Sequence, residues 1–487
     1  MQTDSVISNG VPEDSNGKRP VLMVQELPKD LEPLTALKRL SHLPYPVFLD
    51  SSLENASLGN TSYVAADPFR KVLSSNPDVQ QLQVIDQWLS EFHSPALEGF
   101  PAFQGGVINF CSYDLKSCFE SIPQVADEFG QPQLFAGCYD VVLAFDHLQH
   151  RGWLFSTGFP EMEPNLRRQR GESRMNQFMD WLRSDSSPVG PGERGAHKAA
   201  LNRSDLLPQF DSGISSRVTS DFSKPAYIAA VQRCIDYIYA GDVFQVNLSQ
   251  RLLAPQTAEP LRVYEKLRQQ NPAPFGAYLD LGVFQVLSSS PERLLSIDSR
   301  GNVETRPIKG TRQRSCYPEA NLFLAEGLIT SEKDRSENVM IVDLLRNDLA
   351  KICDPDSIFV SQLCGLEEYE FVQHLVSVIH GRIKKETSFS RLFTAVFPGG
   401  SITGAPKVRA MEIIAEIEPT TRGGYCGSLG YFGWDGAVDQ NILIRTIMMG
   451  RGWCQIPVGG GIVAQSDPLS EYNETVHKAH GMIRALT

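Results

Sequence analysis

A run rich in Pro, Gly and Ser divides the 487-residue sequence into two unequal parts. The run extends from about Ser184 to Lys224 and lacks both the helical and the strand period of apolar residues. Because single domains usually hold ~100–200 residues, a chain of this length is expected to form two substantial lobes. We therefore predict an N-terminal lobe over residues 20–183, a flexible linker over 184–223 and a larger C-terminal domain over 224–487.

The composition argues against several classes of partner and location. The formal net charge is −12 and the sequence pI is near 5.3, whereas nucleic-acid-binding proteins need a basic face. The nine cysteines form no CxxC pair, which is typical of reduced thiols in a cytosol. Residues 1–19 are polar, lack an apolar signal core and are expected to be a flexible tail, and no window of ~18 uncharged apolar residues indicates a membrane span. We therefore predict a cytoplasmic protein that binds neither nucleic acid nor membrane.

The spacing of apolar residues predicts a mixed α/β protein. The N-terminal part combines short β-type runs such as GGVINFCSY with helical stretches such as VIDQWLSEF, which favours an antiparallel α/β lobe. The C-terminal part alternates longer amphipathic helices such as SENVMIVDLLRNDLAKIC with apolar strands such as GAYLDLGVFQVLSSS. Helices of this kind bury their apolar stripe on the face of a sheet.

Two acidic pairs have the spacing of one helix face. Asp334 and Glu337 lie in KDRSEN, and Glu471 and Glu474 lie in SEYNETVHK. If the two helices face each other, these carboxylates can hold Mg²⁺, which prefers few carboxylates and keeps positions for water and an anionic substrate. The spacing by itself favours the alternative, a solvated acidic helix face.

Two glycine-rich turns and one lysine are further candidates for chemistry. The turns, 398–407 (PGGSITGAPK) and 457–467 (PVGGGIVAQSD), can offer backbone N–H groups to anionic oxygens, although each can also be a simple turn. Lys309 lies in ETRPIKGTRQR between Arg306 and Arg312. A lysine beside cations or with poor hydration loses its proton more easily, as a nucleophilic amine requires, although an exposed structural lysine is the alternative.

Nine segments in sequence order resemble the chorismate-utilising enzymes. They are GDVFQVNLSQR (241–251), SSSPERLL (288–295), RPIKGTR (306–312), KDRSENVMIVDLLRNDL (333–349), HLVSVIHG (374–381), FPGGSITGAPK (397–407), YCGSLGYF (425–432), IRTI (444–447) and GGGIVAQSDPLSEYNET (459–475). Nine linked motifs over ~230 residues are not a chance match, whereas any one loop would be weak evidence. The resemblance implies an α/β fold of the α+β type, with large, mostly antiparallel sheets packed face to face and helices on the outside.

The resemblance also implies roles for particular residues. It makes Glu337 and Glu474 the carboxylates that bind Mg²⁺, with Asp334 and Glu471 in the outer shell. It makes Lys309, Glu292 and His374 the groups that act on the substrate or transfer protons. It assigns contacts with chorismate to Gln245, Thr403, Tyr425, Arg445, Gly459, Gly460, Gly461 and Lys478.

Two positions indicate the branch of the family. Lys309 resembles the lysine of the branch that aminates chorismate at C4, whereas the anthranilate-forming branch has a small residue there. Gln245 stands where the isochorismate- and salicylate-forming branches place a lysine to activate water, which an amide cannot do at neutral pH. The resemblance therefore implies that ammonia is the nucleophile. No segment resembles a glutamine-hydrolysing domain, so a class I glutamine amidotransferase subunit is the expected source of ammonia.

Two other functions remain open at the level of sequence. The chain can be an anthranilate-forming enzyme of the same family, or a regulatory protein that binds chorismate or tryptophan without catalysis. LDSS at 49–52 and NPAPF at 271–275 lie where members of the family bind tryptophan, so the N-terminal lobe is a candidate tryptophan site. Intact Glu292, Glu337 and Glu474 argue against the regulatory protein.

Overall fold

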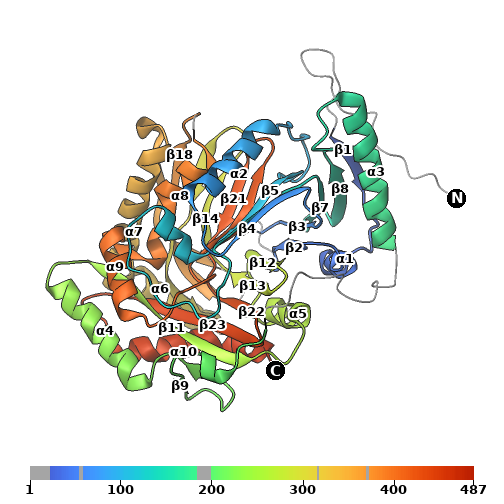
Figure 1. Cartoon of the computed structure of the whole chain (residues 1–487). Coiled ribbons are helices and arrows are strands. Elements are labelled where there is room, and N and C mark those ends of the chain that lie inside the picture. Colours follow the sequence, from blue (N-terminus) through green and yellow to red (C-terminus); the bar gives the residue numbers. More distant parts are fainter. Residues whose placement is uncertain (1–21, 54–58, 184–198, 315–316, 369–371, 386) are drawn as a thin grey trace.

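Two large antiparallel sheets form the centre of the molecule (Figure 1). The computed structural model describes residues 22–53, 59–183, 199–314, 317–368, 372–385 and 387–487. Within these ranges the sheets contain 13 and 10 strands, and the strand pairings are antiparallel. The expected tail over 1–19 lies outside the described residues.

The order of strands places N-terminal and C-terminal segments in the same sheets. The first sheet contains, in spatial order, β1 (Met23–Glu26), β8 (Arg151–Ser156), β7 (Val141–Asp146), β3 (Thr61–Ala65), β2 (Val47–Asp50), β12 (Phe275–Asp280), β13 (Phe284–Ser290), β22 (Thr446–Gly450), β23 (Trp453–Ile462), β11 (Gln245–Pro255), β10 (Thr219–Ser220) and β9 (Phe210–Asp211), with β19 (Gly404–Ala405) paired to β11. The second contains β16 (Ile308–Gln313), β18 (Val372–Arg382), β15 (Asn302–Thr305), β14 (Arg293–Ile297), β21 (Val438–Asn441), β20 (Ser428–Gly433), β5 (Gly106–Cys111), β6 (Leu134–Tyr139) and β4 (Arg70–Ser74), with β17 (Phe359–Glu368) paired to β18.

The two expected lobes are therefore continuous through strand pairing. In the first sheet, β2 from the N-terminal part pairs with β12 from the C-terminal part. In the second sheet, β5 pairs with β20 in the same way. Within the expected linker, residues 184–198 lie outside the described ranges, whereas residues 199–223 include β9 and β10 at the edge of the first sheet.

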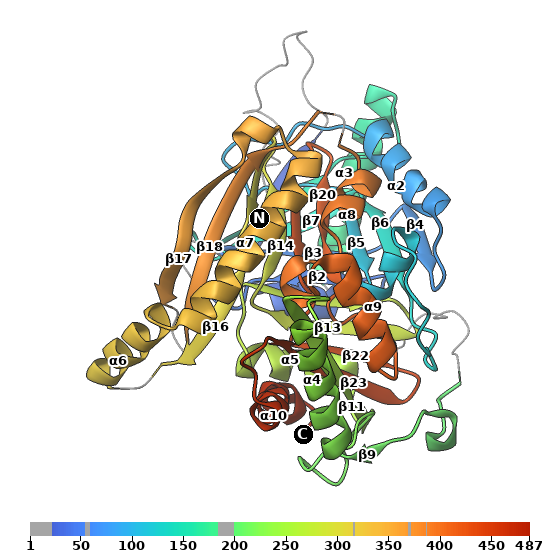
Figure 2. The same ribbon diagram turned by 90° about the vertical axis from the view of Figure 1, so that its left-hand side faces the viewer.

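Helices cover the outer faces of these sheets (Figures 1 and 2). They are α1 (Pro33–Leu40), α2 (Val79–Glu91), α3 (Pro164–Arg183), α4 (Lys224–Tyr239), α5 (Pro260–Gln270), α6 (Pro318–Ile329), α7 (Glu332–Ile352), α8 (Phe389–Val396), α9 (Lys407–Ile417) and α10 (Pro468–Ala485). α10 packs on β23 and against α4 and α5, and α7 packs on β18. Figure 2 shows β16, β17, β18 and α6 extending to one side of the molecule.

The two sheets share an apolar core. Fully or nearly fully buried side chains from both sheets form one cluster, which includes Ile108, Phe110, Phe135 and Tyr431 of the second sheet and Leu279, Val286 and Met448 of the first. Burial of this amount of apolar surface is the main force that holds the sheets face to face. The predicted fold class is confirmed. No helix in the described ranges is both long enough and apolar enough to span a bilayer.

Two capped helices carry the acidic pairs predicted from the sequence. α10 begins with Asp467, whose side chain accepts a hydrogen bond of 2.9 Å from the Ser470 backbone N–H, and Pro468 occupies its first turn. α7 begins with Ser331, whose hydroxyl accepts a hydrogen bond of 3.2 Å from the Asp334 backbone N–H. These caps fix where each helix starts and therefore which side chains face the sheets.

Candidate active site

The glycine run at the end of β23 lies where distant parts of the chain meet. A Cβ atom placed on Gly460 would lie 3.4 Å from Oε2 of Glu471, 3.7 Å from Nζ of Lys478 and 3.8 Å from Oε1 of Glu474. These three residues share one face of α10, because positions three, four and seven apart lie on the same side of a helix. Glycine at this position leaves open the space in front of that face.

The next glycine faces a second group of predicted site residues. A Cβ atom on Gly461 would lie 2.9 Å from Nε2 of Gln245 and 3.4 Å from Nζ of Lys309. The Gln245 side chain is fully buried, and neither its nitrogen nor its oxygen has a hydrogen-bond partner among the described residues. Buried amides are normally paired, so this amide is available to a small polar molecule or a substrate.

The local backbone of β16 directs Lys309 into this space. Lys309 pairs with Leu375 of β18, and the register shifts immediately after it, at Gly310, whose φ is 77°. The Lys309 side chain is 13% exposed, and its Nζ lies 3.9 Å from Oε2 of Glu337. Burial lowers the pKa of Lys309 below 10.5, and nearby Lys478 acts in the same direction, against the opposing effect of the carboxylates.

The sequence offered two causes for a lowered pKa of Lys309, cationic neighbours or poor hydration, and burial is the larger one. The two flanking arginines are not among the causes of the shift. Arg306 precedes β16 and forms an ion pair with Glu367, and Arg312 forms an ion pair of 3.2 Å with Asp334. Their charges are therefore largely compensated by carboxylates. The nearest charged groups to Lys309 come from other elements of the fold, which the local sequence does not reveal.

The two acidic helices face each other through one lysine. The Nζ of Lys333 lies 4.0 Å from Oε1 of Glu337 on its own helix, α7, and 3.7 Å from Oε1 of Glu471 on α10. Glu471 also accepts a hydrogen bond of 2.6 Å from the Ser466 hydroxyl. A positive charge therefore already lies between carboxylates of both helices.

The pKa values of Glu337 and Glu474 are shifted in opposite directions. Burial raises the pKa of Glu337, although Lys309 and Lys333 act against it. Burial also acts to raise the pKa of Glu474, but Lys478, 2.7 Å away, and other cations reverse the effect, and the net shift is downward. Among the described residues, no three His, Cys, Asp or Glu side chains are gathered as a ready-made metal site.

Cationic and polar groups lie around the glycine run Gly459–Gly461. Lys478 donates a hydrogen bond of 2.9 Å to the Gly459 carbonyl, and Arg445 donates one of 3.2 Å to the Lys478 carbonyl. Burial lowers the pKa of Arg445, which interacts electrostatically with Tyr425 and Glu474. Tyr425 is 4% exposed. These groups can bind an anionic substrate in an otherwise acidic protein.

The hydroxyl of Thr403, another predicted substrate contact, is already engaged within its own loop. Its side chain is fully buried and donates a hydrogen bond of 2.9 Å to the Gly399 carbonyl. Its own backbone carbonyl accepts a hydrogen bond of 2.8 Å from the Asn247 N–H, which ties this loop to β11. The hydroxyl oxygen retains a lone pair for a further hydrogen bond.

The two residues expected to transfer protons are both buried. Glu292 accepts a hydrogen bond of 2.7 Å from the Ser401 hydroxyl, and burial raises the pKa of Glu292 despite that bond and nearby Lys309. His374 lies on β18 opposite Thr311, and burial lowers the pKa of His374 to about 4. At neutral pH the imidazole is therefore uncharged and can accept a proton.

Three residues near these groups were not predicted from the sequence. Ser401 orients Glu292, Lys333 lies between the acidic helices, and Asn247 interacts with the Tyr425 side chain. Each residue lies inside a motif quoted above, but the direction in which its side chain points depends on the strand or helix that packs opposite. The sequence could have indicated these residues only by their position within those motifs.

The segments expected to form a tryptophan site also lie together. The Ser51 hydroxyl donates a hydrogen bond of 3.0 Å to the Pro274 carbonyl, and the Ser52 N–H donates one of 3.0 Å to the Ala273 carbonyl. Asp50 forms an ion pair of 2.7 Å with Arg268. Tryptophan binding there stays a prediction.

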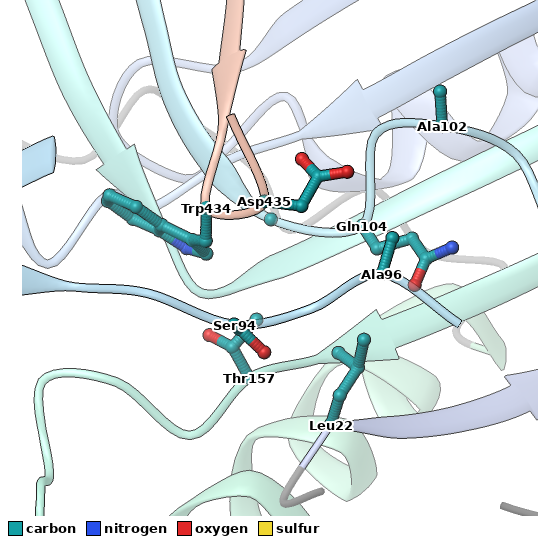
Figure 3. Close-up of a pocket in the computed structure, with 9 residues that line it drawn as sticks. Leu22, Ser94, Ala96, Ala102, Gln104, Thr157, Trp434 and Asp435 are labelled. Atoms are coloured by element: carbon teal, nitrogen blue, oxygen red, sulfur yellow. The ribbon is translucent and has the colours of Figure 1, made fainter. Parts of the chain in front are cut away.

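A small space elsewhere in the fold is separate from this site (Figure 3). It has room for about one water molecule, at about 10 Å³, and none of the predicted site residues lines it. Its lining consists of Leu22, Ser94, Ala96, Ala102, Gln104, Gly105, Thr157, Trp434 and Asp435. The space is too small for an aromatic or cyclic substrate.

Comparison with known proteins adds independent information. A family model described as chorismate binding enzyme matches residues 48–484. Anthranilate synthase component 1 of Thermus thermophilus is 40% identical over 387 residues, which cover 79% of this chain and 78% of that protein. Aminodeoxychorismate synthase component 1 of Escherichia coli is 35% identical over 464 residues, which cover 92% and 94%.

A solved structure agrees with these sequence relationships. Anthranilate synthase component I from Streptococcus pneumoniae superposes with a TM-score of 0.72 at 29% identity, covering 88% of this chain and 93% of that one. The family model spans most of the described fold, including the second sheet, the first sheet apart from β1 and the start of β2, and the site around Gly459–Gly461. The chain belongs to the chorismate binding enzyme family.

Proposed function

We propose that the chain aminates chorismate at C4 to form 4-amino-4-deoxychorismate, with Mg²⁺ as cofactor, in the cytoplasm. The observation that carries this proposal is Lys309, a buried amine with a lowered pKa beside Glu337 and the free Gln245 amide. A lysine that loses its proton more easily is a better nucleophile. Relatives named aminodeoxychorismate synthase component 1 support the same reaction.

In this proposal the amine of Lys309 attacks C2 of the ring as the C4 hydroxyl leaves. Ammonia then adds at C4 and expels the lysine, so that two displacements deliver nitrogen to C4. The raised pKa of Glu292 favours its protonated form, which can give a proton to the departing hydroxyl so that it leaves as water. The neutral His374 is suited to accept a proton rather than to donate one.

Gln245 supports ammonia over water as the nucleophile. Its carboxamide cannot act as a base at neutral pH, but it can donate and accept hydrogen bonds. Both side-chain atoms are unpaired among the described residues, and Nε2 of Gln245 and Nζ of Lys309 both lie within 3.4 Å of the position that a Cβ atom on Gly461 would take. We infer that this amide binds substrate or ammonia. Arg445, Lys478, Tyr425 and Thr403, with the backbone of Gly459–Gly461, are the proposed contacts for the carboxylates of chorismate.

The residues around Lys333 fit a magnesium ion. An ammonium group lies between carboxylates of α7 and α10, which supports the proposal of a cation at this position. Mg²⁺ usually binds one or two protein carboxylates and completes its coordination with water and substrate oxygens. Glu337 and Glu474 would hold it, with Asp334 and Glu471 in the outer shell. When bound, it would offset the charge of these carboxylates against the ring carboxylate of the substrate.

The proposed nitrogen source is a separate subunit. The curated relatives named above are each called component 1, which supports a partner component. We propose a class I glutamine amidotransferase as that partner, because the reaction consumes ammonia.

One alternative reaction has a specific observation in its favour. Anthranilate synthase component 1 of Thermus thermophilus has the higher identity of the two relatives compared here, at 40% against 35%. Overall sequence identity does not show which ring carbon receives the nitrogen. The residue at position 309 bears on this choice directly, because its amine is the proposed nucleophile toward the ring. We therefore rank C4 amination first and anthranilate formation second.

Product identification separates the two reactions. Purified full-length protein would be incubated with chorismate, Mg²⁺ and an ammonium salt at alkaline pH, and the product analysed by chromatography with mass detection. We expect 4-amino-4-deoxychorismate, which retains the enolpyruvyl group. Fluorescent anthranilate together with released pyruvate would overturn the assignment in favour of the alternative.

A further inference from the structure

One lysine closes the base of the loop that carries Ser401 and Thr403. This loop, called the site loop below, comprises residues 397–406 between α8 and α9. Lys407 is the first residue of α9, and its ammonium group donates a hydrogen bond of 3.4 Å to the carbonyl of Val396, the last residue of α8. The two ends of the site loop are therefore joined through one side chain.

The same ammonium group pairs with a carboxylate on α7. The Nζ of Lys407 lies 2.6 Å from Oδ2 of Asp348, and the two side chains are only 13% and 2% exposed. Lys351 also lies 3.2 Å from Asp348, but it is 52% exposed, and screened pairs of this kind contribute little. Lys407 is therefore the buried partner of this carboxylate, and its removal would leave a buried charge poorly compensated.

A second contact with α7 lies one helical turn away from this ion pair. A Cβ atom on Gly400 would lie 2.5 Å from Cδ2 of Leu344, so the backbone of the site loop runs directly against α7. Leu344 and Asp348 are four residues apart and share one face of the helix. Glu337 lies seven residues before Leu344 on the same side. One helix thus carries the proposed metal carboxylate and both contacts with the site loop.

The later half of the site loop is held on other elements. The carbonyl of Ile402 accepts a hydrogen bond of 3.1 Å from Arg422, and that of Thr403 accepts one of 2.8 Å from the Asn247 N–H. The next two residues form β19, which pairs with β11. Thr403 is therefore fixed on the first sheet by contacts that do not involve α7.

The earlier half of the site loop carries the group that orients the proposed proton donor. The hydroxyl of Ser401 donates a hydrogen bond of 2.7 Å to Oε1 of Glu292. The backbone of Glu292 is itself fixed, because its carbonyl accepts a hydrogen bond of 3.0 Å from the Ile442 N–H. Ser401 directly follows Gly400, the residue that contacts α7. The contacts with α7 therefore bear on Ser401 more than on Thr403.

We propose that Asp348 and Lys407 are positioning residues, whose ion pair holds the site loop against α7 so that Ser401 keeps the Glu292 carboxyl aimed at the departing hydroxyl. Proton transfer requires donor and acceptor within hydrogen-bond reach, so a small displacement of Glu292 slows this step. The inference rests on the proposed function, in which Glu292 gives this proton. Asp348 and Lys407 act through the site loop and not by contact with the substrate.

The test separates positioning from stability by an apolar replacement of the pair. Replacing both members of a buried ion pair by apolar side chains of similar volume is often neutral for stability, whereas removal of one member is destabilising. The full-length variant Asp348→Leu/Lys407→Met therefore keeps the packing and removes the directional contact. Lys351→Met is the matched control, because it removes the other, more exposed cation beside Asp348.

We expect Asp348→Leu/Lys407→Met to lower kcat for chorismate amination at least about tenfold. The KM for chorismate should change less than about threefold, because Thr403 stays fixed on β11. Lys407→Arg keeps a cation opposite Asp348 and should recover kcat to within about threefold of the unmodified protein. Lys351→Met should leave kcat unchanged.

A second measurement asks whether the pair acts through Ser401. Ser401→Ala removes the hydroxyl that orients Glu292, and it should lower kcat by a factor similar to that of the apolar pair. Adding Ser401→Ala to the apolar pair should then lower kcat by less than about a further twofold, because effects that act through one shared contact do not add. If the apolar pair fails to fold, as judged by thermal unfolding, Asp348→Asn with and without Ser401→Ala gives the same comparison.

A normal kcat in the folded apolar pair, or in Asp348→Asn where it takes the place of that variant, would show that the pair only stabilises the fold. Independent, multiplying effects of the pair and of Ser401→Ala would also overturn the inference. The product of the unmodified protein is a separate result. Anthranilate in place of 4-amino-4-deoxychorismate would overturn the proposed function and would leave the comparison of rates among the variants unaffected.

Discussion

The Nζ atom of Lys309 lies 3.9 Å from Oε2 of Glu337, although the two residues belong to a strand and a helix on different parts of the chain. This pair joins the two kinds of chemistry proposed for the site, an amine for bond formation and a carboxylate for a divalent cation. Burial favours the neutral amine and the carboxylate favours the ammonium, and burial has the larger effect on the pKa of Lys309. The following predictions test each side of this relationship.

Substitution of Lys309 should separate nucleophilic from electrostatic roles. Lys309→Arg keeps the charge but removes the nucleophile, because a guanidinium stays protonated at any usable pH. We expect amination to fall by roughly 100-fold or more. Lys309→Ala is expected to admit ammonia at C2 and to yield some aminodeoxyisochorismate or anthranilate. Mass detection of the product shows which carbon is aminated. Peptide mapping should show a chorismate-derived adduct on the peptide that contains Lys309 when ammonia is withheld. Full activity and C4 selectivity in the arginine variant would eliminate the covalent route.

Removal of one carboxylate should weaken Mg²⁺ binding. Glu337→Gln and Glu474→Gln each replace a charged oxygen ligand with an amide of similar volume, and we expect the Mg²⁺ concentration for half-maximal turnover to rise by roughly 100-fold. Glu332→Gln is the matched control, because Glu332 lies on the same helix but is exposed. Metal-dependent turnover and thermal unfolding are measured together. Normal turnover of either site variant at limiting Mg²⁺ would indicate only a solvated acidic face.

Removal of Lys333 should have the opposite effect on the metal. Its ammonium lies 4.0 Å from Glu337 and 3.7 Å from Glu471, so it competes with a cation for the same carboxylates. Because Lys333 is 46% exposed and therefore screened, we expect Lys333→Met to lower the half-saturating Mg²⁺ concentration by only about three- to fivefold. Lys351→Met, at the other end of α7, is the control. A higher half-saturating Mg²⁺ concentration in Lys333→Met than in the unmodified protein would contradict a shared cation site.

Protonation of His374 should destabilise the folded protein in mild acid. Burial lowers the pKa of His374 from 6.5 to about 4, so between these values the unfolded chain binds a proton that the folded chain does not. The stability from this group is complete above pH 6.5 and is lost as the pH falls towards 4. The full effect is on the order of 3 kcal/mol. Urea unfolding at several pH values should show that the free energy of unfolding falls more steeply with decreasing pH in the unmodified protein than in His374→Gln. Parallel pH dependences of the two proteins would exclude this role of His374.

The sequence was sufficient for the fold class and for the family. Apolar runs with strand and helix periods predicted a mixed α/β protein, and the ordered motifs resembled one enzyme family, whose antiparallel sheets the structure confirms. These features depend on the spacing of residues that are close in sequence, which can be analysed without the tertiary structure. The acidic pairs Asp334–Glu337 and Glu471–Glu474 were recognised for the same reason, because i, i+3 spacing on a helix is local.

Only the tertiary structure decided what surrounds each of these groups. Position 309 could be read from the sequence, but the sequence could not decide between cationic neighbours and poor hydration as the cause of a lowered pKa. The structure favours burial, because Arg306 and Arg312 are paired with Glu367 and Asp334. Burial and charges from α7 and α10 determine the state of Lys309, and both depend on contacts between residues far apart in the chain. The burial of Gln245 and Ser249 on β11 was likewise hidden, because it depends on the packing of β23 and of the segment around Glu418 against that strand. Local spacing thus fixed which residues share an element, and long-range packing fixed their charge, their hydration and their partners.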